Sequence, residues 1–245
     1  MEKVYFFATC LGGAVFTQTS VNAVKLLQDQ GVSVVFKKEQ TCCGQPSFNT
    51  GYFADTKKIA LYNIDLFSEN YPVIVPSGSC AGMMKHDYVE LLKGSEHETR
   101  AKEFAGRVYE LSEYLDRELK AEYKDQGEKI KITWHSNCHA LRVQKCIESS
   151  KNILRQFENV ELIELEREEE CCGFGGTFAV KEDEISNAMV QEKIKWIQQS
   201  GADYVVSADS GCLLNIGGAL AKANSRVKSV HLYDFMAKRI KGDIL

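Results

Sequence analysis

The chain repeats one cysteine pattern twice, and this duplication limits its possible folds more than any other feature. In each half an apolar run ends in a cysteine, a Cys-Cys-Gly triplet follows, and a second apolar run ends in another cysteine. The three landmarks recur 128, 129 and 132 residues later, in the same order, and a weaker echo pairs residues 110–115 with 231–236. This nearly constant separation indicates two homologous halves, which we place at residues 1–125 and 126–245. The repeated cysteines are Cys10, Cys42, Cys43, Cys80, Cys138, Cys171, Cys172 and Cys212.

Short apolar strands alternate with longer helical patterns in both halves. Strands are predicted near residues 3–8, 32–37, 72–76, 130–135, 160–165 and 203–207, and helices near residues 15–29, 54–68, 81–92, 140–157, 183–199 and 213–223. Near-continuous apolar strands separated by helices are typical of parallel sheets covered on both faces. The sequence therefore predicts an α/β fold of two homologous Rossmann-like halves with parallel sheets, related by pseudo-twofold symmetry. The charged stretch at 94–129 is expected to be a solvated helix with a loop at 125–127.

Charge and hydropathy exclude several classes of protein. The 245-residue chain has a formal net charge of −4, so it lacks the basic balance that would make nucleic acid or an anionic membrane its main partner. No apolar run reaches the roughly 18 residues that a membrane span needs. The uncharged segment Val4–Phe16 follows a head without net charge, so it is interpreted as a buried strand and glycine turn rather than a signal peptide. These features favour a cytoplasmic protein, in which thiols stay reduced.

The repeated cysteines lie where a parallel sheet would gather them. Ligands of such sheets bind outside the carboxyl ends of the strands. Four of the cysteines lie just past predicted strand ends, and each Cys-Cys pair follows the second strand of its half by a short loop. Each half thus supplies four thiolates, the ligand set of a cubane iron–sulfur cluster. Adjacent side chains on an extended strand point to opposite faces, so both cysteines of a pair can face one centre only in a sharp turn, which the following glycine permits.

Other uses of the nine cysteines stay open. Zinc also binds four cysteines and is possible in one of the sites, although its structural sites usually contain C-x₂₋₄-C pairs. Buried inert thiols and disulfides are the remaining alternatives, and the odd count means that disulfides cannot pair every cysteine. Cys146 lies outside the repeat and is interpreted as a plain thiol.

Several longer motifs resemble a known family. The segments TCCGQPSFNTGY (41–52), PSGSC (76–80), HSNCHALR (135–142), ECCGFGGTFAVK (170–181) and SGCLLNIGG (210–218) are similar to those of LutA/YkgE-type lactate utilisation proteins, within the cysteine-rich CCG domain family. That family includes heterodisulfide reductase B and the iron–sulfur subunit of glycolate oxidase. The resemblance covers essentially the full length of the chain.

The resemblance implies an oxidoreductase subunit that passes electrons from the oxidation of L-lactate to pyruvate, in a complex with LutB-like and LutC-like subunits. It also implies that the eight repeated cysteines hold up to two iron–sulfur clusters, of the 4Fe-4S type. Where heterodisulfide reductase B has Cys-x-x-Cys at the end of each repeat, this chain has Ser77 and Asp209 in place of the first cysteine. Each could supply an oxygen ligand or, as Asp and Ser often do, cap the following helix.

Two residues near Cys138 are the candidate catalytic residues. A 2-hydroxy acid such as L-lactate needs a cation to hold its carboxylate and a base to take its hydroxyl proton. His139 and Arg142 offer these groups, although packing beside a cluster or pairing with an acidic neighbour would also explain them. Lys181 is a further possible anchor, and His135 is interpreted as a strand-end packing residue.

Two other functions are compatible with the same pattern. One is a zinc-stabilised scaffold or assembly subunit without redox chemistry, which metal analysis would separate from an iron–sulfur protein. The other is a thiol/disulfide oxidoreductase that resembles heterodisulfide reductase, which disulfide-dependent turnover would identify.

Overall fold

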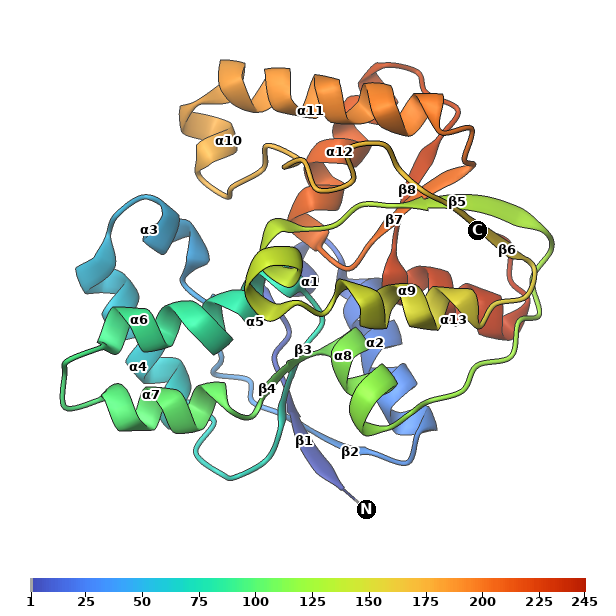
Figure 1. The fold of residues 1–245 in the computed structure, drawn as a ribbon. Helices are drawn as coiled ribbons and strands as arrows, with labels where there is room; N and C mark the ends of the chain where they lie inside the picture. Colours follow the sequence, from blue (N-terminus) through green and yellow to red (C-terminus); the bar gives the residue numbers. More distant parts are fainter. Residues whose placement is uncertain (1) are drawn as a thin grey trace.

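Each half of the chain forms a four-stranded parallel sheet (Figure 1), which confirms the predicted α/β class. The computed structural model describes residues 2–245. The first sheet has the order β2-β1-β3-β4 and the second the order β6-β5-β7-β8, so the second half repeats the topology of the first. The strands are β1 (Lys3–Phe6), β2 (Ser33–Phe36), β3 (Val73–Val75), β4 (Val108–Glu110), β5 (Ile130–Trp134), β6 (Val160–Ile163), β7 (Tyr204–Ser207) and β8 (Lys228–His231).

The predicted helices overlap observed ones in both halves. Charge and glycine explain two of the helix ends: α11 begins with two acidic residues at its positive end, and α13 ends at Gly242, whose φ is 72°. The first half contains α1 (Cys10–Ala14), α2 (Thr17–Asp29), α3 (Gln45–Asn49), α4 (Phe53–Leu66), α5 (Gly78–Gly82), η1 (Met83–Asp87), α6 (Tyr88–Leu92), α7 (Glu98–Ala105), α8 (Leu111–Glu113) and η2 (Tyr114–Glu118). The second half contains η3 (Ala140–Gln144), α9 (Ile147–Arg155), α10 (Phe178–Lys181), α11 (Asp183–Gln199), α12 (Ser210–Lys222) and α13 (Leu232–Lys241). The η elements are π-helical turns.

The fourth strand of each sheet corrects the sequence prediction. We predicted three strands in each half, but β4 and β8 add a fourth beside β3 and β7. The prediction of a solvated helix at 94–129 is therefore wrong in part. This stretch contains the strand β4, and Tyr114 and Leu115, a few residues after β4, are buried. Both missed strands end where the weak echo of residues 110–115 and 231–236 begins, so the echo marks a real structural repeat.

One of the three buried apolar clusters joins the two sheets, and each half also has a cluster of its own. Val4 and Phe6 of the first sheet belong to the same buried cluster as Ile132 and Trp134 of the second. Helices cross between the halves in matching pairs: α2 packs on α13, and the equivalent α9 packs on α8 and η2. Figure 1 shows α2 beside α13, and α9 beside α8, on the side where the halves meet. This reciprocal exchange of helices fits the predicted pseudo-twofold relation.

The division of the chain at residues 125/126 stays a prediction. The sheets fall on either side of it, but the cluster that they share means that neither half buries all of its apolar surface alone. None of the helices in residues 2–245 has the length and apolar character needed to cross a bilayer.

Candidate metal centre

All eight repeated cysteines line one pocket at the carboxyl ends of the two sheets. The pocket has a volume of about 220 Å³ and receives residues from both halves. Cys10 begins α1 directly after β1, and Cys80 lies in α5 after β3. Cys138 and Cys212 occupy the equivalent places after β5 and β7. The fold thus brings together the cysteines that the sequence singled out, and Cys146 does not line the pocket.

The sulfur atoms of each half form close pairs. In the first half, Cys42 Sγ lies 3.8 Å from Cys10 Sγ, and Cys43 Sγ lies 3.3 Å from Cys80 Sγ. In the second half, Cys172 Sγ and Cys212 Sγ lie within 4.8 Å of each other, and Cys138 and Cys171 are close enough to shift each other's pKa. Each half therefore offers four sulfur donors within one small volume.

Both Cys-Cys pairs turn sharply, as predicted. Gly44 and Gly173 have φ values of 89° and 81°, in the left-handed region that glycine adopts without strain. Their backbone N–H groups point at the preceding sulfurs, with Gly44 N 3.5 Å from Cys42 Sγ and Gly173 N 3.4 Å from Cys171 Sγ. Such N–H groups stabilise negative charge on sulfur.

The pKa shifts of the neighbouring thiols fit a site that binds a cation. The hydrogen bond to Cys171 and burial both raise the pKa of Cys138, whereas the same hydrogen bond from Cys138 lowers the pKa of Cys171. Packed thiols of this kind cannot all ionise unless a cation replaces their protons. Sulfur donors are soft ligands that suit iron–sulfur clusters and zinc. The donor set therefore fits a metal ion or cluster in each half.

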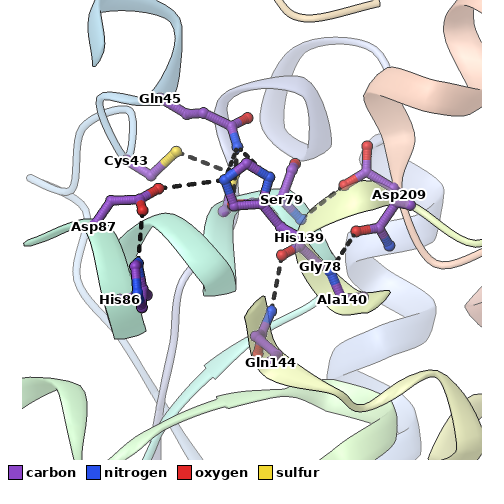
Figure 2. A network of polar contacts seen from close by, with 12 residues as sticks. Cys43, Gln45, Gly78, Ser79, His86, Asp87, His139, Ala140, Gln144 and Asp209 are labelled. Atoms are coloured by element: carbon purple, nitrogen blue, oxygen red, sulfur yellow. Dashed lines mark hydrogen bonds and ion pairs between the residues drawn. The ribbon is translucent and has the colours of Figure 1, made fainter. Parts of the chain in front are cut away.

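Asp209 is a cap rather than a free oxygen donor. Its Oδ1 accepts hydrogen bonds from Gly211 N and Cys212 N at the start of α12, both at 3.1 Å. Its Oδ2 crosses to the first half and accepts from the Ser77 hydroxyl at 3.0 Å and from Ser79 N at 2.9 Å, and Figure 2 shows the contact with Ser79. The cap interpretation is confirmed for Asp209, and the Ser77 side chain binds Asp209 instead of capping α5.

His139 reaches from the second half into the first. Its Nε2 lies 3.3 Å from Asp87 Oδ2, and the Gln45 amide nitrogen lies 3.2 Å from the same ring atom (Figure 2). Asp87 also pairs with His86, at 3.0 Å. Burial acts to raise the pKa of Asp87, but the hydrogen bonds from the two imidazoles outweigh it and hold the pKa below its usual value. His139 thus lines the pocket with its ring held by an acidic partner.

The other two predicted contact residues lie away from the pocket lining. Arg142 is exposed, and its Nη2 lies 3.4 Å from the carbonyl oxygen of Glu169. The Lys181 ammonium lies 5.5 Å from the ring centre of Tyr52. Of the three candidates for substrate contact, the structure places only His139 in the pocket lining.

Sequence reasoning missed a possible donor in the second half. His135 is completely buried, as its assignment to packing implies, but its ring lies beside Cys172 and Cys212. The candidate donor atoms of these three residues lie within 4.8 Å of one another. The available signal was the difference between the repeats, because the position equivalent to His135 in the first half is Phe7.

The comparisons with known proteins agree with this architecture. The family model described as "Cysteine-rich domain" (CCG) matches residues 4–85 and 132–217. "Lactate utilization protein A" of Halalkalibacterium halodurans is 41% identical over 235 residues, which cover 96% of each chain. "Lactate utilization protein A 2" of Bacillus cereus is 41% identical over 238 residues, covering 96% of this chain and 98% of the relative.

A solved structure supports the fold alone. A hypothetical protein from Helicobacter pylori superposes with a TM-score of 0.69 at 13% identity, covering 99% of this chain and 50% of that one. Two parallel sheets with paired cysteine turns and one shared pocket define the cysteine-rich class of α/β protein. The chain belongs to the CCG cysteine-rich domain family and, within it, to the lactate utilization protein A group.

Proposed function

We propose that this protein is the metal-bearing subunit of a system that oxidises L-lactate to pyruvate, and that it carries electrons away from that reaction. The observation that carries the proposal is the gathering of eight thiols, four from each half, in one pocket. Thiols so close together are a poor arrangement for a purely structural core, because each must stay protonated or find a cation.

The relatives supply the substrate in this proposal. Proteins at 41% identity over 96% of the chain bear the name lactate utilization protein A. A letter that distinguishes one protein of a system implies others, and we propose LutB-like and LutC-like subunits as the partners. Oxidation of a 2-hydroxy acid to a 2-oxo acid releases electrons that such partners would receive.

Each quartet would hold its own centre. Cys10, Cys42, Cys43 and Cys80 would bind one iron–sulfur cluster, and Cys138, Cys171, Cys172 and Cys212 the other. When bound, such clusters accept and release single electrons. The chain itself supplies the sulfur donors and the two glycine turns that direct adjacent sulfurs inward.

His139 is the residue that we propose to take part in proton transfer. Asp87 holds its ring through the 3.3 Å contact at Nε2, an arrangement that orients an imidazole for proton transfer. Arg142 would attract the substrate carboxylate from outside the pocket lining, because its guanidinium is exposed.

Anaerobic spectroscopy with and without L-lactate tests the proposal. The protein is purified without oxygen, and its visible and electron paramagnetic resonance spectra are recorded before and after adding L-lactate, with and without the partner subunits. We expect iron–sulfur spectra that change on lactate addition only when the partners are present. Zinc as the sole metal would favour a scaffold instead. Turnover that depends on a disulfide substrate, with spectra insensitive to lactate, would favour a thiol/disulfide oxidoreductase.

A further inference from the structure

The second quartet of cysteines has a neighbour that the first quartet lacks. His135 directly follows β5, three residues before Cys138, and its side chain is completely buried. At the equivalent place after β1, three residues before Cys10, stands Phe7, which is also completely buried. The same fold therefore accepts a ring without polar atoms at this position.

Both nitrogen atoms of the His135 ring lack a hydrogen-bond partner among residues 2–245. Leaving a buried polar group without a hydrogen-bond partner destabilises the folded state. Since Phe7 shows that the fold does not need a polar ring here, an imidazole at this position is explained best by a partner that the chain itself does not provide.

The surroundings of the ring show where that partner binds. One ring nitrogen of His135 and the sulfurs of Cys172 and Cys212 all lie within 4.8 Å of one another. Small side-chain rotations bring such atoms onto one metal ion, whose bonds to nitrogen and sulfur are about 2.0–2.3 Å long. The nearby ammonium of Lys193 is occupied elsewhere, because it donates to the carbonyl oxygens of Arg167 at 2.6 Å and Glu168 at 3.2 Å.

We propose that His135 is a nitrogen ligand of the metal group held by the second half. The two halves then carry chemically different centres, one with sulfur donors only and one with sulfur and imidazole donors. This inference rests on the proposed function only in that the thiols must bind metal. It does not depend on lactate as the substrate or on the identity of the partner subunits.

The variant His135→Phe tests the proposal, because it gives the second half the ring that the first half already has. The full-length protein is reconstituted without oxygen with Fe²⁺ and sulfide, once with natural histidine and once with ¹⁵N-histidine, reduced with dithionite to the paramagnetic state, and studied by pulsed electron paramagnetic resonance. We expect one of the two centres to show a strong nitrogen coupling that changes with the isotope and disappears in His135→Phe. His139→Phe is the matched control and should keep the coupling, because its ring contacts Asp87 and Gln45 instead.

A second measurement uses the metal-free protein and Zn²⁺ alone. We expect His135→Phe to weaken Zn²⁺ binding at one site by about tenfold or more, the scale of effect for residues that support a metal site, and to leave the other site unchanged. His135→Asn serves if the phenyl ring prevents folding. Two loaded centres without nitrogen coupling, or a coupling that persists in the variants, would overturn the inference and leave the proposed function intact. A folded protein that binds no metal in either half would overturn both.

Discussion

The two Cys-Cys-Gly turns share a backbone conformation but differ in what surrounds them. In the first half, the Tyr88 hydroxyl donates to the Cys43 carbonyl at 2.8 Å, and the Asn63 amide donates to the Cys42 carbonyl at 3.1 Å. In the second half, the Asn215 amide donates to the Cys172 carbonyl at 2.8 Å. The duplication has thus kept the turn and its four sulfurs while the residues that hold the turn have changed.

The walls behind the sulfurs differ in polarity as well. Phe7 belongs to the same buried apolar cluster as Cys43 and Cys80 of the first quartet, whereas His135 and the fully buried Lys193 lie near the second quartet. Hydrogen bonds, charge and burial around a cluster set its reduction potential. Two sites with the same four sulfur ligands therefore need not hold equivalent centres.

The largest effect is expected from removing one thiol of a single quartet. Because each quartet would hold its own centre, Cys43→Ser should empty the first half and leave the second loaded, and Cys172→Ser should do the reverse. Each variant is expected to bind about half of the wild-type metal, measured by elemental analysis after anaerobic purification. Cys146→Ser is the control and should bind the full amount, since Cys146 is buried outside the pocket. Loss of all metal from either single variant would show one joint centre instead.

Asp209 gives the next largest effect, because one carboxylate serves both halves. Asp209→Ala leaves Ser79 N, Gly211 N and Cys212 N without their acceptor. Removing the acceptor from a buried, charged network of this kind is expected to cost about 4 kcal/mol of unfolding free energy. Urea unfolding of the metal-free protein measures it. Ser77→Ala, at the equivalent position of the first half, removes a single hydroxyl contact and should cost about 1 kcal/mol. Equal losses in the two variants would contradict the unequal roles.

Glu110 and His231 occupy equivalent capping positions with opposite pH behaviour. Burial raises the pKa of Glu110 to about 7, so the folded state favours its neutral form. The stability it contributes is complete below the unfolded pKa of about 4.3 and is lost as pH rises through about 7, a loss of about 4 kcal/mol. Glu110→Gln should abolish this loss, measured by urea unfolding between pH 5 and pH 8.

The cap in the second half provides the comparison. Burial lowers the pKa of His231 to about 4, so stability is complete above the unfolded pKa of about 6.5 and is lost as pH falls toward 4. His231→Asn should flatten the acid side of the stability profile and leave the neutral side as it was. A Glu110→Gln profile parallel to that of the wild type would contradict the assignment of Glu110.

His139 gives the smallest expected effect of the series, on turnover rather than on metal binding. Its equivalent in the first half is Leu11, so His139→Leu removes the imidazole and restores the symmetry of the repeat. Loss of a positioned acid–base group costs about 100-fold in rate, so lactate turnover by the assembled complex should fall about that much while metal content stays unchanged. Arg142→Ala should show a smaller loss, because that side chain is exposed. Unchanged turnover in His139→Leu would remove this residue from the reaction.

Part of this structure could be predicted from the sequence because it rests on local patterns. The apolar strands and the Cys-Cys-Gly turns are encoded within a few residues, and the parallel topology then fixes where the strand ends meet. That is why the convergence of each quartet at the end of its own sheet could be expected from the sequence, whereas the single pocket that both quartets line could not.

The remaining features depend on contacts between distant residues. β4 and β8 are only three and four residues long, and polar residues flank them in the sequence. The apolar pattern that would predict a strand is therefore weak at both places. The hydrogen bond between Ser77 and Asp209 joins residues that are 132 positions apart, and the sequence around neither residue predicts it. The buried ring of His135 beside two sulfurs likewise becomes visible only when the strand and the cysteine turn are placed together.

The central claim is that each quartet of thiols holds a metal centre of its own, and metal stoichiometry tests it most directly. The wild-type protein is purified without oxygen, and iron, zinc and acid-labile sulfide are counted per chain. The account predicts two centres per chain, with iron and sulfide together in at least one of them. A correctly folded chain that carries neither iron nor zinc, even after anaerobic reconstitution, would contradict it.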